Sequence, residues 1–215
     1  SVRTLGPLIH NPQEMQRLAH EGVTTIQEPV QIKRGETAVI RAHGVTPDVQ
    51  KELEEKASKV VDATCPFVTR VQKLAARAAA QDRHVIVVGS PDHPEMIGVK
   101  GYAPDHAFVI RDETEVAGLP ELRRPLVVSQ TTIKAKTFFD TADAVRSKTK
   151  DTVEVVNTIC SATRDRQDAA REFLHRLRIQ VGIDLPRIPD QNEGQARIAP
   201  DDVVDLAQLA ARAGV

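Results

Sequence analysis

The sequence has few aromatic residues and no tryptophan: 3% of its 215 residues are aromatic, and one is tyrosine. Proteins that bind single-stranded nucleic acid stack bases on aromatic side chains, so this composition argues against such a platform. The net charge is −1 and the Lys and Arg residues are spread along the chain, so no basic face for DNA or an anionic membrane is indicated. An anionic ligand would have to be bound by local geometry.

Long apolar runs are also lacking. No stretch of about 18 apolar residues predicts a membrane span, and the amino terminus has no signal-peptide pattern, so we expect a cytoplasmic protein. The chain opens at Ser1 without a methionine and enters a motif almost at once. We interpret this as a start from which upstream residues are missing.

Only two cysteines are present, Cys65 and Cys160, which are too few for a disulfide framework and too far apart for a zinc knuckle. Each ends a short run rich in β-branched residues, which is typical of a strand. A thiol at the carboxyl end of a strand lies in the crevice where open α/β sheets bind ligands. The plain alternative for each is a buried structural thiol.

Two successive units of the chain have the same order of predicted elements. In each, a strand leads to a His-containing turn, a second strand to a polar turn, and a third strand to a cysteine, with helices between them. The segments Gly6–Met15 and Gly89–Met96 even share the order Gly, Pro, His, Pro, Glu, Met. Alternating strands and helices predict parallel sheets.

We therefore predict an α/β fold with two successive pseudo-repeated lobes, each a small, mostly parallel sheet flanked by helices, plus an incomplete third lobe. The predicted boundaries are residues 1–65, 66–160 and 161–215. The last part is expected to hold a helix at Ser161–Arg178, an irregular linker at Gln180–Pro200 and an amphipathic helix at Asp201–Ala213.

If equivalent strand ends of the two lobes face each other, one concave site receives imidazoles, thiols, hydroxyls and a carboxylate. Thiolates select iron–sulfur clusters, zinc or copper(I). Imidazoles together with helix N-terminal amides suit a phosphate or diphosphate. A buried carboxyl can donate a proton, and a hydroxyl can extend the relay. The candidate residues are His10, His43, Cys65, His93, Glu95, Thr131, Thr132 and Cys160.

Simpler explanations exist for several of these positions. Pro12 and Pro94 can serve only to begin helices, and Thr131 and Thr132 can serve only as helix N-caps. The remaining histidines lie in helix or strand patterns and are interpreted as solvated or core residues. They are His20, His84, His106 and His175.

Six ordered segments, within about residues 4–175, resemble the 4-hydroxy-3-methylbut-2-enyl diphosphate reductase family, the last enzyme of the methylerythritol phosphate route to isoprenoids. They are LGPLIHNP at Leu5–Pro12, RAHGV at Arg41–Val45, VDATCPFV at Val61–Val68, HPEMIGVKG at His93–Gly101, VSQTT at Val128–Thr132 and NTICSATRDRQ at Asn157–Gln167.

The resemblance implies three α/β lobes around a cavity that holds an oxygen-sensitive 4Fe-4S cluster, bound by three cysteines, with one iron left open for the substrate hydroxyl. By matching position, Cys65 and Cys160 are implied as metal ligands and Glu95 and Thr131 as catalytic residues. The implied substrate-binding residues are His10, His43, His93 and Thr132.

The resemblance further implies that ferredoxin or flavodoxin donates the electrons, and that the prenyl diphosphate substrate yields isopentenyl and dimethylallyl diphosphate. Neither a nucleic acid nor a membrane is an expected partner. The family's first cysteine lies upstream of the equivalent of Thr4, and its third-lobe Ser and Asn residues have no match in Ile179–Val215, so we expect a truncated chain.

Two alternatives stay open at this point. One is a cluster-free diphosphate-binding module, or a catalytically inactive remnant of the reductase. The other is a dithiol redox or zinc protein that uses Cys65 and Cys160 alone.

Overall fold

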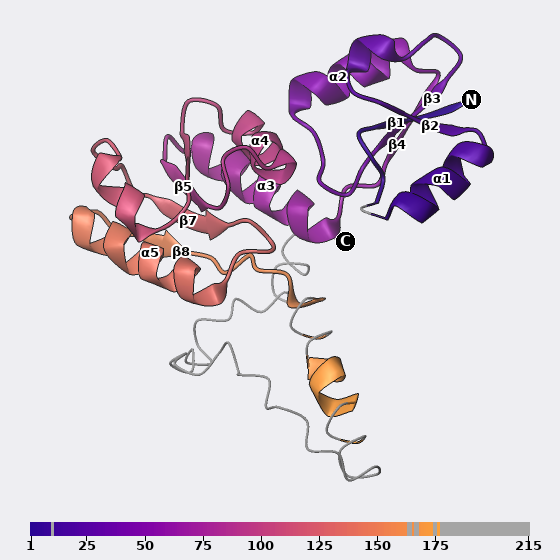
Figure 1. Ribbon diagram of the computed structural model, residues 1–215. Coiled ribbons are helices and arrows are strands. Elements are labelled where there is room, and N and C mark those ends of the chain that lie inside the picture. Colours follow the sequence, from indigo (N-terminus) through magenta and orange to yellow (C-terminus); the bar gives the residue numbers. More distant parts are fainter. Residues whose placement is uncertain (10, 163–164, 166–167, 174–175, 177–215) are drawn as a thin grey trace, which may run out of the picture.

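The computed structural model describes residues 1–9, 11–162, 165, 168–173 and 176. Within this part the chain forms two α/β lobes, and helix α3 runs from the last strand of the first lobe to the first strand of the second (Figure 1). No helix in the described part is long and apolar enough to cross a membrane.

The first lobe is a four-stranded parallel sheet with the strand order β2-β1-β3-β4. Its core is one apolar cluster that includes Ile26, Ile40 and Leu53. Its elements are β1 (Val2–Leu5), α1 (Pro12–His20), β2 (Val23–Ile26), the 3-10 helix η1 (Pro29–Gln31), β3 (Thr37–Ile40), α2 (Pro47–Lys56) and β4 (Lys59–Asp62).

The second lobe is also a four-stranded parallel sheet, and its order is β6-β5-β7-β8. Helices α3 and α4 lie on one side of this sheet and α5 on the other (Figure 1). Its elements are α3 (Pro66–Ala79), β5 (Val85–Val88), α4 (Pro94–Gly101), β6 (Ala107–Ile110), the 3-10 helix η2 (Glu113–Gly118), β7 (Leu126–Ser129), α5 (Ala135–Lys148) and β8 (Glu154–Val155).

The two sheets have the same topology, because β1, β2, β3 and β4 correspond in order to β5, β6, β7 and β8. The predicted α/β class and the repeat of two small parallel sheets are confirmed. The helix predicted at Ser161–Arg178 is described only in part, and its described residues have helical backbone. The linker and the terminal helix predicted beyond residue 179 lie outside the described residues.

The second sheet is buried on both faces. All four residues of β5 are buried, and so are all four of β7. One apolar cluster fills the space toward α3 and α4, and another fills the space toward α5. A strand covered on both faces needs apolar residues at every position, which explains the continuous run Val85–Val88.

Proline begins each of the first four α-helices, where its missing N–H costs no hydrogen bond. The side chains of Asn11, Thr46 and His93 cap three of them by accepting a backbone N–H. Thr131 and Thr132 are not caps, because α5 begins only at Ala135. The two threonines lie in the turn between β7 and α5, so the capping interpretation was wrong.

His84, directly before β5, is a buried structural histidine with 8% of its surface exposed. Its Nδ1 accepts the backbone N–H of Arg123 at 3.2 Å, and its ring meets Phe108 edge to face. Burial lowers its pKa, and the charges of Arg123 and His106 add to this effect while Asp82 opposes it. The folded protein therefore favours the neutral imidazole of His84 more than the unfolded chain does.

This state of His84 predicts a loss of stability in mild acid. The unfolded chain takes up the proton near the ordinary histidine pKa of 6.5, whereas the folded chain does so only at lower pH. The free energy of unfolding should therefore fall as the pH drops below that value. In His84→Asn, the Oδ1 can still accept the N–H of Arg123, but the side chain cannot titrate. Urea unfolding at a series of pH values should therefore show a smaller decrease in unfolding free energy in mild acid than in the wild type. His20→Asn, at an exposed site, should retain the full decrease, and an unchanged slope in His84→Asn would contradict the assignment.

Candidate active site

The candidate residues follow the central strands of each sheet, on either side of which the order of the strands reverses. The chain passes from β1 outward to β2 and then returns to β3 on the other side, and β5, β6 and β7 repeat this path. Open α/β sheets bind ligands at this switch point, beyond the carboxyl ends of the strands. His43 follows β3, His93 follows β5 and Thr131 follows β7. His10 lies outside the described residues.

The two lobes meet where α4 packs against the turn after β3. A β-carbon at Gly101 would lie 2.5 Å from Cγ2 of Thr46, and one at Gly98 would lie 3.7 Å from the carbonyl oxygen of His43. The missing side chain at residue 101 thus allows the helix to approach the turn closely. The contact brings the rings of His43 and His93 together edge to face, with centroids 5.2 Å apart and planes at 85°.

Glu95 and Thr131 form a buried hydrogen-bonded pair. Glu95 is in the first turn of α4 and is 1% exposed. Its Oε1 accepts the backbone N–H of Thr131 and its Oε2 accepts the hydroxyl, both at 2.8 Å. The backbone N–H of Glu95 in turn donates to Nδ1 of His93 at 3.2 Å. Glu95 therefore contacts Thr131 through its carboxyl and the imidazole of His93 through its backbone N–H.

Burial raises the pKa of Glu95 above its ordinary value. The two hydrogen bonds from Thr131 and the charge of His93 work in the opposite direction, because they stabilise the carboxylate, but they do not cancel the loss of solvation. A carboxyl with a raised pKa keeps its proton closer to neutral pH and can act as a general acid.

Both cysteines lie past the ends of their strands, farther than their apolar runs predict. Cys65 is the N-cap residue of α3, and its backbone N–H donates to the carbonyl of Ala42 at 2.9 Å. Cys160 follows the short β8, and its N–H donates to the carbonyl of Thr131 at 2.7 Å. Each cysteine is thus tied to the turn after the neighbouring strand, so the two occupy equivalent places in the two lobes.

Thr132 does not share the environment of Thr131. It is exposed, and its hydroxyl accepts from the side-chain amide of Gln130 at 2.9 Å. Gln130 also accepts the backbone N–H of Ser90 at 3.0 Å, which holds the turn after β5 against the turn after β7. The described contacts therefore connect Thr132 to a structural bridge and not to Glu95.

Sequence reasoning missed Gln130 and Thr158 as residues that shape the site. Thr158 is 2% exposed, and its hydroxyl both accepts the N–H of Ser129 and donates to the carbonyl of Ser129, at 2.8 Å each. This fixes the segment that leads to Cys160 beside the end of β7. Both residues lie inside the motifs quoted above. A polar side chain next to a predicted buried strand is the sequence feature that could have identified them.

The two thiols suit an iron–sulfur cluster in kind but not in number. Both are free and half-buried, and thiolates are the usual ligands of such clusters. The family resemblance implies three cysteines, and no group of three or more His, Cys, Asp or Glu side chains within the described ranges could hold a metal ion. These residues alone do not complete a site for the cluster.

The fold and this geometry define an α/β protein with a buried acid and paired imidazoles where two similar lobes meet. A family model described as LytB protein matches residues 1–182, and the chain belongs to this family. The resemblance recognised in the six sequence segments is thereby confirmed.

Curated relatives include a 4-hydroxy-3-methylbut-2-enyl diphosphate reductase from Alkaliphilus oremlandii, 36% identical over 180 residues, and one from Thermoanaerobacter sp., 38% identical over 184 residues. The alignments cover 84% and 85% of this chain and 64% of each relative. The chain therefore spans about 64% of the length of these relatives.

Two solved structures share the fold of this chain. One of (E)-4-hydroxy-3-methyl-but-2-enyl diphosphate reductase matches with a TM-score of 0.72 at 36% identity, over 80% of this chain and 61% of that one. A structure of the E-1-hydroxy-2-methyl-but-2-enyl-4-diphosphate reductase from Plasmodium falciparum matches with a TM-score of 0.72 at 24% identity, over 81% of this chain and 56% of that one, which is a likeness of fold.

The raised pKa of Glu95 predicts a stability that depends on pH. The folded state binds this proton more tightly than the unfolded state, so the contribution is complete below the ordinary glutamate pKa of 4.5. It is lost as the pH rises through the folded pKa. In Glu95→Gln, which cannot ionise, the difference in unfolding free energy from the wild type should therefore shift in favour of the variant as the pH rises.

Urea unfolding from pH 4 to 8 measures this difference. Glu121→Gln, at an exposed site, serves as the matched control and should follow the wild type. A difference between wild type and Glu95→Gln that stays constant with pH would show that burial does not perturb this carboxyl.

Proposed function

We propose that this chain supplies substrate-binding and proton-donating lobes of a reductase that converts 4-hydroxy-3-methylbut-2-enyl diphosphate to isopentenyl and dimethylallyl diphosphate. The reaction breaks the allylic C–O bond, forms a C–H bond and releases the oxygen as water, at the expense of two electrons and two protons. The observation that supports it best is the buried Glu95–Thr131 pair beside His93.

Glu95 is the proposed proton source. Once protonated on Oε2, it can donate to the hydroxyl oxygen of Thr131, which is 2.8 Å away. That hydroxyl can then turn and pass its own proton to the leaving oxygen or the allylic carbon. Burial favours this role because a carboxyl with a raised pKa is protonated at higher pH.

The diphosphate is the proposed ligand of the histidines. His43 and His93 come from different lobes and meet at 5.2 Å, so both imidazoles can donate N–H groups to one anion. His10 and Thr132 are assigned to the same substrate by the family resemblance. The N-terminus of α4 contributes favourable partial charge next to His93.

Binding of inorganic diphosphate to the anaerobically purified chain tests this assignment. His43→Ala and His93→Ala should each raise the Kd by about tenfold, the equivalent of ~1.4 kcal/mol lost with one hydrogen bond to a charged group. His106→Ala removes an imidazole that is hydrogen-bonded to Asp82 away from this site, and it should leave the Kd unchanged. Calorimetry measures all three, and equal affinity of both site variants and the wild type would contradict the proposal.

The proposed cofactor is a 4Fe-4S cluster with Cys65 and Cys160 as two of its ligands, reduced by ferredoxin or flavodoxin. A cluster with an open iron supplies a Lewis acid for the hydroxyl and single electrons. The described residues supply two thiols for it, Cys65 and Cys160. The chain's own groups bind the diphosphate, hold the proton and orient the allylic alcohol.

Iron content tests the ligand assignment. After anaerobic reconstitution with iron and sulfide, Cys65→Ser and Cys160→Ser should each carry much less iron per chain than the wild type, since thiolates are the expected ligands. Ser161→Ala, next to Cys160, should match the wild type. Iron that is retained in both serine variants would refute the assignment. A wild type that binds diphosphate but no iron would favour the cluster-free binding protein.

A further inference from the structure

Arg41 begins the turn that carries His43. It directly follows β3, and the backbone N–H of Gly44 donates to its carbonyl at 2.9 Å, which closes a tight turn. Arg41 and His43 are therefore held at fixed positions in one turn, at the carboxyl end of a strand that borders the switch point of the first sheet. The family resemblance assigns no role to this arginine.

The guanidinium of Arg41 lies against Gly6, the first residue after β1. A β-carbon at residue 6 would come within 2.7 Å of Cζ and 3.1 Å of Nε of Arg41. Gly6 also has a φ of +74°, a conformation that residues with side chains rarely adopt. Glycine at this position thus allows a permanent positive charge to lie over the end of β1, where open α/β sheets bind ligands.

Arg41 is half-buried, yet within the described part of the chain no carboxylate pairs with it and no acceptor meets its guanidinium. Two other half-buried arginines do have carboxylate partners: Arg3 pairs with Glu36 at 2.9 Å and Arg83 with Glu154 at 2.6 Å. Loss of solvation alone lowers the pKa of Arg41. None of its nitrogens is both fully buried and unsatisfied, so its N–H groups remain accessible from solvent.

We propose that Arg41 is a further diphosphate-binding residue, whose guanidinium forms hydrogen bonds with phosphoryl oxygens of the same group that His43 and His93 bind. This proposal rests on the proposed function above. The guanidinium is planar and presents a fork of N–H donors that matches two oxygens of a phosphate. A cation that is partly desolvated without a partner is unfavourable in the free protein, and an anionic ligand offsets that cost.

Inorganic diphosphate titrated into the full chain, followed by calorimetry and by the ³¹P spectrum of the probe, tests this role. Arg41→Met keeps the aliphatic stem over Gly6 but removes the charge. It should raise the Kd by at least about tenfold, as expected for hydrogen bonds to a charged group, with little change in the thermal unfolding midpoint. Arg41→Lys keeps the charge without the fork and should give an intermediate Kd.

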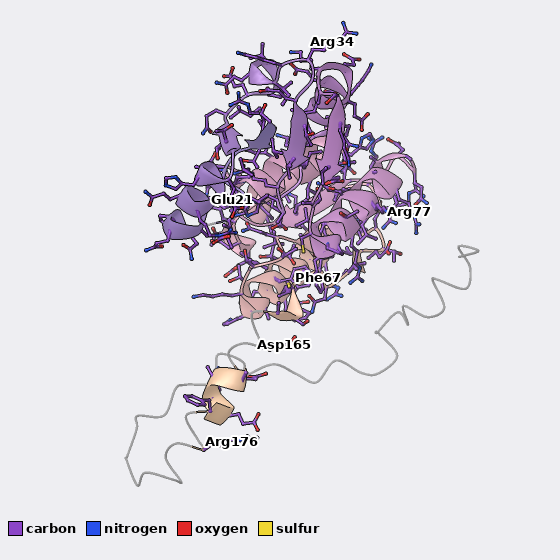
Figure 2. All side chains as sticks on the ribbon, turned by 90° about the vertical axis from the view of Figure 1, so that its right-hand side faces the viewer. Glu21, Arg34, Phe67, Arg77, Asp165 and Arg176 are labelled. Carbon is purple, nitrogen blue, oxygen red and sulfur yellow. The ribbon has the colours of Figure 1, made fainter. Side chains whose placement is uncertain are left out.

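Arg34→Met is the matched control, because it removes the same charge from an exposed site. Figure 2 shows Arg34 at one end of the described lobes, well away from Phe67, which follows Cys65 by two residues. Its Kd should equal that of the wild type. Added salt should reduce the difference in Kd between the wild type and Arg41→Met, because screening weakens a charge contact that only the wild type makes.

The possible outcomes distinguish a failure of the Arg41 assignment from a failure of the proposed diphosphate-binding function. If the wild type binds diphosphate and both Arg41 variants bind it equally well, Arg41 is not a ligand-binding residue and the histidine assignment stands. If affinity falls only together with the unfolding midpoint, or equally in Arg34→Met, the role is structural or a general charge effect, which also overturns the proposal. A wild type that does not bind diphosphate overturns both.

Discussion

The close contact between α4 and the turn after β3 is the constraint on which the site depends. A β-carbon at Gly101 would lie 2.5 Å from Thr46, so a larger residue would push the helix and the turn apart. The same joint buries Gln72, whose side-chain nitrogen would lie 2.5 Å from a β-carbon at Gly44. Because His43 precedes Gly44, and α4 starts after His93, the spacing of the imidazoles is set by this backbone packing.

Within the second lobe, hydrogen bonds through Thr131 link the position of Glu95 to that of Cys160. Glu95 accepts twice from Thr131, and the carbonyl of Thr131 accepts from the N–H of Cys160. Each such bond contributes only ~1 kcal/mol net, but leaving a buried carboxyl without donors costs more than that. The carboxyl therefore constrains the turn after β7, and this turn constrains the cysteine. A change at any one of the three is expected to displace the others.

Much of this arrangement follows from local rules that can be read in the sequence. Parallel strands end at one edge of a sheet, so residues after consecutive strands, such as His43, were expected near the joint with His93. Other features depend on tertiary contacts that no local pattern encodes. From the sequence, Gly98 and Gly101 are recognisable only as poor helix formers, although in the structure they lie where the two lobes contact each other. Thr131 has the pattern of an N-cap but lies in a turn, because its N–H and hydroxyl both go to Glu95.

The two lobes share a backbone plan but differ in the chemistry of equivalent turns. The turn after β3 carries Arg41 and His43, whereas the turn after β7 carries Thr131 against Glu95. Electrostatics gives a reason for this division. A guanidinium beside Glu95 would stabilise the carboxylate and lower its pKa, which would release the proton that a general acid must keep. With Arg41 on the first lobe and Glu95 buried in the second, the proposed anion-binding charge does not lower the pKa of the proposed acid.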